Sequence, residues 1–189
     1  RFLVFTFGTP GENECGILNI QNKVYSLQNN VSSTGTCFNI KANNITLNCN
    51  GYEINYSYSG VLGYGVYNSG FNETAIKNCK IVEGTDTGGD NSGIQFENAH
   101  NGTIINNTII TIGTSSEAIA LYSSSNISIL NNNLTAENGG GKGIEITSSS
   151  FNFISNNVII TFDANGEGIR IGGSGGSNSN KIFNNNIFI

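Results

Sequence analysis

Carboxylates are the side chains in this sequence best suited to chemistry, because enzymes that cleave sugar chains need acids converging on one substrate. Two columns recur every 25 residues, the first reading Gln95, Ala120, Glu145 and Arg170 and the second Ser92, Glu117, Lys142 and Glu167. Neighbours alternate in sign, so the second column predicts a solvated ion-pair ladder worth roughly 0.5 kcal/mol per pair, with Glu145 paired to Arg170 beside it. We therefore expect no catalytic residues and no enzymatic activity.

Metal ligands are scarce. Histidine occurs once, at His100, where a surface position in a turn is expected, and methionine is absent. The four cysteines lack the C-x-x-C spacing of zinc sites. Asp86 and Asp90 lie in a Gly-rich stretch and form an alternative calcium pair, although the sequence favours ordinary turn residues there. We expect neither a metal nor a cofactor.

Composition and charge narrow the class of protein. The 189 residues correspond to one domain, and 37% of them are hydrophobic, which supports a folded chain. The net charge of −5 makes nucleic acid an unsuitable partner, since phosphate binding needs clustered cations. No apolar run approaches the ~20 residues of a membrane span.

Two motifs repeat along the chain. The first, Ile-x-Asn-Asn/Cys-x-Ile/Leu, begins at Ile76, Ile104, Ile129, Ile154 and Ile182. The second, small-Ile-x-apolar, begins at Gly93, Ala118, Gly143 and Gly168, at a constant spacing of 25 residues. Side chains alternate within each motif, as expected for strands, and a third short strand follows each Asn pair. Stacked repeats of this kind bury one shared core, which predicts a solenoid of about six coils with three strands per coil and a period of 25–28 residues.

The paired asparagines are expected to build a corner rather than a binding row. Asparagine tolerates the left-handed backbone of a sharp turn, and its amide can bond to the backbone and to the asparagine one coil away. Cys79 takes the second Asn slot of its coil, and Cys49 falls near the same corner one coil earlier. Four cysteines allow three pairings, of which Cys49–Cys79 with Cys15–Cys37 is favoured. Two disulfides indicate an oxidising compartment.

Asparagine sequons are candidate glycosylation sites in an extracellular protein. Three of them occupy the same exposed turn of successive coils, a fourth is one residue away from it, and a fifth points outward beyond the Asn corner. These five are Asn44, Asn101, Asn126, Asn72 and Asn133.

Together these motifs resemble the right-handed parallel β-helix repeat family, the pectin-lyase-like superfamily, over about residues 35–189. Residues 15–51 are similar to the first coil of secreted or surface-anchored β-helix proteins of archaea and bacteria. The resemblance implies an all-β, right-handed parallel β-helix and an extracellular or cell-surface location. A fold alone does not supply a function.

The ends of the predicted column suggest how it is used. Residues 1–34 are expected to form an N-terminal strand and cap, and residues 35–189 the β-helix of the same structural domain. The last coil finishes in mid-strand, which leaves either a fragment or an open end. We expect a structural cell-surface or filament subunit that binds itself head-to-tail, with cell-surface glycans as a second class of partner. The alternative is a carbohydrate-binding or polysaccharide-cleaving pectin-lyase-like protein.

Overall fold

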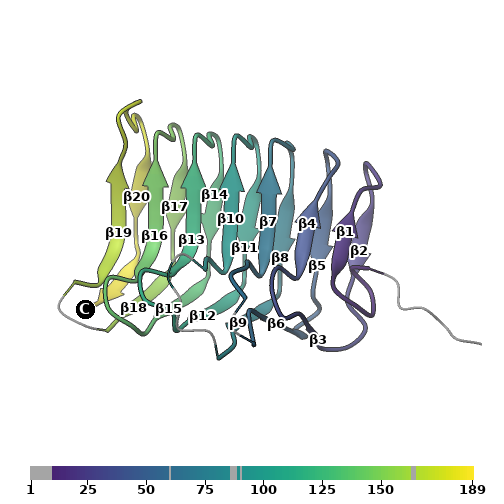
Figure 1. Ribbon diagram of the computed structural model, residues 1–189. Helices are drawn as coiled ribbons and strands as arrows, with labels where there is room; N and C mark the ends of the chain where they lie inside the picture. Colours follow the sequence, from purple (N-terminus) through teal and green to yellow (C-terminus); the bar gives the residue numbers. More distant parts are fainter. Residues whose placement is uncertain (1–9, 60, 86–88, 90, 163–164) are drawn as a thin grey trace, which may run out of the picture.

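The computed structural model describes residues 10–59, 61–85, 89, 91–162 and 165–189. These residues form 21 short strands and wind into a column with three parallel sheets along its sides (Figure 1). Each strand pairs with its equivalent from the next coil, so neighbours in a sheet are three elements apart in the chain. The predicted parallel β-helix with three strands per coil is confirmed. The described residues contain no helix long and apolar enough to cross a membrane.

Each sheet has seven strands. The first sheet contains β1 (Gly16–Leu18), β4 (Phe38–Ile40), β7 (Val66–Ser69), β10 (Ile94–Glu97), β13 (Glu117–Tyr122), β16 (Lys142–Thr147) and β19 (Glu167–Gly172). The second contains β2 (Val24–Ser26), β5 (Thr46–Asn48), β8 (Ala75–Lys77), β11 (Thr103–Ile105), β14 (Ser128–Leu130), β17 (Phe153–Ser155) and β20 (Lys181–Phe183). The third contains β3 (Val31–Ser32), β6 (Glu53–Tyr56), β9 (Lys80–Glu83), β12 (Thr108–Thr111), β15 (Asn133–Ala136), β18 (Val158–Thr161) and β21 (Asn186–Phe188).

The column has seven coils, one more than the repeats predicted. The additional coil is the first, β1–β3, and it lies within residues 1–34 that the sequence assigned to a cap. It lacks the Ile-x-Asn-Asn motif, so the repeat did not reveal it. Buried Gly11 lies against Leu18 and Tyr25 of this coil, so the segment preceding β1 covers the core there. The apolar stretch at residues 2–7 lies outside the described residues.

The small residue that opens the second motif has a steric cause. A Cβ built on Gly143 falls 2.2 Å from Cγ2 of Ile159 in the third sheet, and one on Gly93 falls 2.3 Å from Cγ2 of Ile109. Ala118 takes this position in the coil between them, and there the register places a leucine, Leu134, opposite it. Leucine has no methyl group on its Cβ. The position of Ala118 therefore accommodates alanine, because the residue opposite it in the third sheet is not β-branched.

Gly143→Ala is therefore expected to destabilise the fold by about 1–3 kcal/mol, because the added methyl overpacks the corner. Combining it with Ile159→Leu should recover the part of that loss caused by Ile159, but not the part caused by the Gly168 carbonyl oxygen, which lies 2.6 Å from the added methyl. Denaturant unfolding of both single variants and the double variant measures the coupling. Gly172→Ala is the matched control, since a Cβ there meets nothing within 4 Å. Strictly additive losses would contradict this explanation.

The two asparagines of the corner have separate tasks. The first has left-handed backbone, with φ of 55° at Asn78, 54° at Asn131 and 57° at Asn156. The second is buried and forms a ladder: the Asn107 amide donates to the Asn132 Oδ1 at 3.0 Å, and Asn132 donates to Asn157 at the same distance. The predicted structural role of the Asn column is confirmed.

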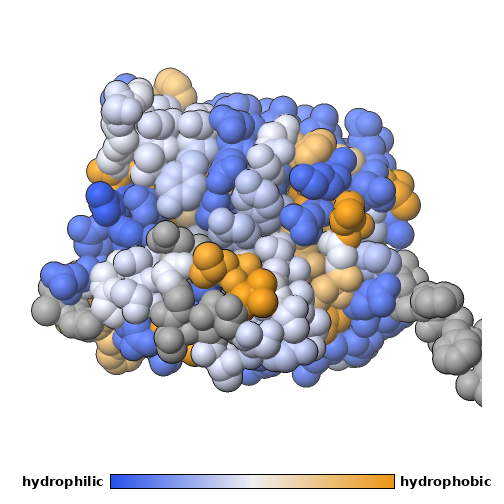
Figure 2. All heavy atoms as spheres, in the orientation of Figure 1, coloured by the Kyte–Doolittle hydropathy of each residue, from blue (hydrophilic) through white to orange (hydrophobic). Residues whose placement is uncertain are grey.

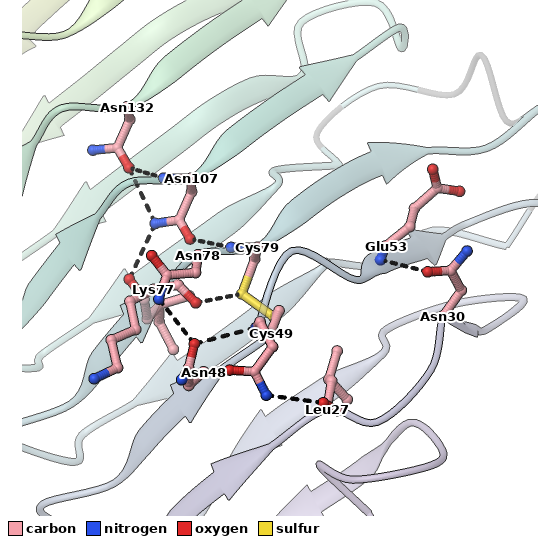
Figure 3. Close-up of a disulfide and its surroundings, with 12 residues drawn as sticks. Leu27, Asn30, Asn48, Cys49, Glu53, Lys77, Asn78, Cys79, Asn107 and Asn132 are labelled. Atoms are coloured by element: carbon pink, nitrogen blue, oxygen red, sulfur yellow. Dashed lines mark hydrogen bonds between the residues drawn. A yellow bond between two sulfur atoms is a disulfide. The ribbon is translucent and has the colours of Figure 1, made fainter.

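Two disulfides staple the N-terminal coils. They join Cys15 to Cys37 and Cys49 to Cys79, the pairing that the sequence favoured. Figure 3 shows the second bond at the Asn corner, where the Cys79 N–H donates to Asn107 Oδ1 at 2.9 Å. Cys79 thus occupies the next position of the asparagine ladder, and the disulfide continues that column toward the N-terminal coils.

Candidate functional site

The candidate site is a charged cluster on the outer face of the first sheet, formed by the two columns in which the sequence placed the carboxylates. The small residue that opens each small-Ile-x-apolar motif interrupts the alternation of inward and outward side chains along the strand. The side chain immediately before it therefore points outward, like the one three positions later. In the register, Glu117 lies between Ser92 and Lys142, and Lys142 lies between Glu117 and Glu167. We call Glu117, Lys142, Glu145, Glu167 and Arg170 the charged cluster.

Lys142 is the centre of this cluster. Its Nζ lies 2.7 Å from Glu117 Oε1 and 3.1 Å from Glu145 Oε2. Ser92 donates its hydroxyl to the other Glu117 oxygen at 3.1 Å, and Arg170 Nε lies 3.9 Å from Glu145. Both carboxylates are therefore engaged by the same ammonium group.

The expectation that this ladder is solvated was wrong. Glu117 is 3% exposed, and Lys142 and Glu145 are each 8% exposed. Side chains in the middle of the column are shielded by their equivalents one coil above and one below, which sequence spacing does not convey. Arg170, in the last coil, remains exposed. Buried charges of this kind depend on one another far more than surface pairs do.

Burial and pairing move the two carboxylates in opposite directions. Burial raises the pKa of Glu117, although the hydrogen bond and charge of Lys142 oppose this. Burial also acts on Glu145, but there Lys142 prevails and the pKa is lowered. Burial would lower the pKa of Lys142, yet its bonds to both glutamates raise it. The two glutamates thus favour the cationic form of Lys142.

A tyrosine group lies beside the charged cluster on the same face. The Tyr67 hydroxyl donates to Glu97 Oε2 at 2.7 Å, and Gln95 Nε2 donates to Glu97 Oε1 at 2.6 Å. Tyr64 stacks on Tyr67 with ring centroids 4.9 Å apart. Figure 2 shows that this side of the molecule is mainly hydrophilic, with small, separated hydrophobic groups. The polar groups therefore largely satisfy one another.

Glu83 is a buried carboxylate that the sequence analysis did not single out. It is 2% exposed, and its Oε2 accepts from the N–H groups of Ile112 and Gly113 at 2.7 and 2.9 Å. Burial raises its pKa, although these donors act against the rise. The available signal in the sequence was its position two residues after inward-facing Ile81, because side chains two apart on a strand face the same side. The contacts show an anchor for the turn after β12.

The other predicted residues lie apart from the cluster. His100 is half-buried in a turn of a different corner, and its Nδ1 accepts from the Ser125 N–H at 3.2 Å. Asp86 and Asp90 lie outside the described residues. Within the described part of the chain, no three His, Cys, Asp or Glu side chains are grouped so as to hold a metal ion.

A family model described as periplasmic copper-binding protein (NosD) matches residues 76–188. The chain belongs to the NosD family. NosD is a parallel β-helix family of the pectin-lyase-like superfamily, so the resemblance seen in the repeats is confirmed. The periplasmic family and the two disulfides together place the chain outside the cytoplasm. No curated protein and no solved structure matches it.

The copper named in the NosD description does not fit the donors of this chain. Copper sites in proteins favour thiolate, thioether and imidazole ligands. This sequence has no methionine and one histidine, and all four of its cysteines are in disulfides. The oxidised chain therefore lacks the set of soft ligands that a copper ion requires.

We accordingly expect no stoichiometric copper site. Equilibrium dialysis of the oxidised chain against copper(II) should leave less than one tightly held ion per molecule, with His100→Ala giving the same result. Retention of one copper per chain that His100→Ala abolishes would contradict this expectation. Anaerobic dialysis of the disulfide-reduced chain against copper(I) is a positive control, because free thiolates bind copper(I).

Proposed function

We propose that the chain is a non-catalytic structural scaffold of the extracytoplasmic space. The observation that carries this proposal is that the charged groups of the cluster pair with one another. A polysaccharide-cleaving site needs one carboxyl group free to donate a proton and another free to act as base or nucleophile. Here Glu117 and Glu145 share one ammonium, and both are more than nine-tenths buried.

The rest of the described column supports the same role. Its corners are fixed by left-handed asparagines, its interior by stacked isoleucines, and its N-terminal coils by disulfides. Each coil is stabilised by contact with its neighbours, so the whole stack behaves as a stiff rod.

Polysaccharide digestion tests this proposal against its alternative. The chain is incubated with neutral and acidic polysaccharides, and reducing ends and unsaturated products are measured. We expect neither to exceed the buffer control. Product formation that Lys142→Met alters but Lys23→Met leaves unchanged would place catalysis at the charged cluster and overturn the scaffold role.

Head-to-tail assembly is a second candidate function, and the coil β19–β21 would supply one of its two contact surfaces. Ile171, Ile182 and Ile187 continue the inward columns of the coils before them, yet they are 45%, 40% and 43% exposed. A further coil stacked there would bury these side chains and pair the free strand edges. We propose that a second copy supplies that surface and that repetition of the contact gives a filament.

Negative-stain electron microscopy of the full-length native protein tests this assembly. Filaments are expected, and Ile182→Lys combined with Ile187→Lys should disperse them, because charges would enter the stacking surface. Leu62→Lys, at another exposed apolar position, is the control. Single dispersed particles at high protein concentration would remove the assembly proposal and leave the scaffold proposal standing.

Glycosylation of the exterior is also proposed. Asn44, Asn101 and Asn126 share one exposed corner with φ between 53° and 58°, and Asn133 is exposed at the start of β15. Asn72 is less suitable, because it is half-buried and its Oδ1 accepts from the His100 N–H at 2.8 Å. Peptide mass mapping of the native protein should find glycans at the first four sites before Asn72. An unmodified mass would contradict this proposal.

A further inference from the structure

Three exposed phenylalanines gather on the outer side of the second sheet, on β17, on β20 and in the turn before β17. Phe153 and Phe183 pack edge to face, with ring centroids 4.8 Å apart. They point outward because they alternate with the inward-facing Ile154 and Ile182. Phe151, in the turn, is 63% exposed. We call Phe151, Phe153 and Phe183 the Phe patch. Exposed groups of large apolar side chains mark interaction surfaces.

The backbone of Phe151 gives a second indication of a contact. The residue two positions before each strand of the second sheet is left-handed in every coil, with φ between 53° and 63°. Asparagine tolerates this conformation and takes the position in four of the seven coils (Asn22, Asn44, Asn101 and Asn126). Phe151 adopts it with a φ of 59°. A bulky side chain that is both strained and exposed costs the monomer stability, which points to a role outside the monomer.

A second apolar patch lies on the first coil, on the same side of the column. Ile17, Ile20 and Val24 are each more than half exposed, and they surround the turn between β1 and β2. We call these three residues the Ile patch. The turns between the first and second sheets follow one edge of the column in Figure 1, and both patches lie along that edge. About five coils separate the two patches.

The strip of the second sheet between the patches is almost free of charge. Its outward side chains form two columns, most of them small, β-branched or aliphatic. These are Val24, Thr46, Ala75, Thr103 and Ser128 in the first column, and Ser26, Asn48, Lys77, Ile105 and Leu130 in the second. Over the seven described strands, Lys77 and Lys181 are the only charged residues in these columns. Depletion of charge is typical of the centre of a protein interface.

We propose that two copies of this chain bind each other across this face in antiparallel orientation. A two-fold axis near β11 then places the Phe patch of each copy on the Ile patch of the other. Both contacts form at once, so the assembly closes as a dimer. Burial of the two apolar patches offsets the cost of the strained backbone at Phe151. This lateral contact goes beyond the scaffold role and uses a different surface from the head-to-tail stacking.

Charges and candidate glycans are compatible with this arrangement. At ~4.8 Å per coil, Lys77 lies about 10 Å along the column from its copy, and Lys181 lies further from its own. Lys181 of one copy approaches Lys23 of the other, whose charge is balanced by Glu12 at 3.7 Å. The sequons in the turns before the strands lie along the rim of the face, between the two patches (Asn44, Asn101 and Asn126).

Sedimentation equilibrium of the full-length native protein tests the proposal. We expect particles of two chains with a micromolar dissociation constant, because a narrow strip of this kind is at the small end of specific interfaces. Phe151→Asn and Val24→Thr should each weaken the dimer tenfold or more. Leu62→Asn, which removes an equally exposed apolar side chain from another corner, is the matched control and should dimerise normally.

Stability separates a contact role from a structural one. Phe151→Asn should raise the melting temperature at dilutions where only the monomer is present, because asparagine suits a φ of 59°. The same substitution should weaken the dimer. If filaments form, Ile182→Lys combined with Ile187→Lys blocks the stacking, and the dimer should persist in that variant.

A charge exchange tests the antiparallel pairing. Ile20→Glu and Phe151→Lys should each disrupt the dimer, and the double variant should restore it, because opposite charges then meet across the interface. A single chain per particle at every concentration up to the millimolar range would overturn the proposal. So would a dimer that survives both Phe151→Asn and Val24→Thr, or a double variant that stays monomeric.

Discussion

Asn132→Ala is expected to lower the free energy of unfolding by about 3–5 kcal/mol, because one side chain satisfies several buried groups. Its Oδ1 accepts from the backbone and the amide of Asn107 at 2.9 and 3.0 Å, and its Nδ2 donates to the Ile104 carbonyl at 3.0 Å. Alanine removes all three bonds and leaves the buried Asn107 N–H without this acceptor, although the Asn107 amide keeps its bond to the Ile76 carbonyl. Urea unfolding followed by circular dichroism measures the loss.

Asn133→Ala, one position further along, is the control for this variant. Asn133 is exposed, and its substitution is expected to change stability by less than about 0.5 kcal/mol. Equal losses for the two variants would show that the ladder contributes no more than the surface. Asn131→Ala should fall between them, because alanine fits the left-handed φ of 54° poorly.

Lys142→Met is expected to cost about 3–5 kcal/mol at neutral pH, because it leaves two buried carboxylates facing each other without their shared cation. Arg170 compensates Glu145 only weakly at 3.9 Å. Lys80→Met provides the control: its pair with Glu53 is similarly short at 2.9 Å, but the lysine side chain is 50% exposed. That loss should stay below about 1 kcal/mol.

The pH dependence of Lys142→Met identifies the cause of its instability. Without Lys142, the folded-state pKa of Glu117 and Glu145 rises above the unfolded value near 4.5, so the folded variant binds more protons. Its stability is then greatest below that value and is lost as pH rises through the folded pKa. The deficit relative to the unmodified chain should shrink between pH 7 and 4. A constant deficit would show that lost packing, rather than charge, explains it.

The repeats predicted most of the fold because each coil of a solenoid uses a similar number of residues, so equivalent positions recur at a regular spacing in the sequence. The inward isoleucines, the left-handed first asparagine and the Cys49–Cys79 staple all followed from one period. The repeats did not reveal the first coil, because its strands around Leu18 and Tyr25 carry no Asn pair. Only the resemblance of residues 15–51 to the first coil of other β-helix proteins pointed to it. Recognising it depends on register with β4 and β5, which is a tertiary property.

The functional surfaces were less predictable. The spacing of the columns placed Glu117, Lys142 and Glu145 together. Their burial depends on contacts with the coils on either side, which spacing alone does not reveal.

The constant register between coils has a consequence for how such a chain changes its length. Because β13, β16 and β19 pair without offset across 25 residues, a tandem duplication of one period inserts a whole coil and leaves both ends in phase. Each duplication lengthens the rod by about 4.8 Å, the spacing between strands. The length of the rod can therefore change in steps of one coil when a short stretch of the gene is duplicated, and the outer surfaces of its coils stay aligned.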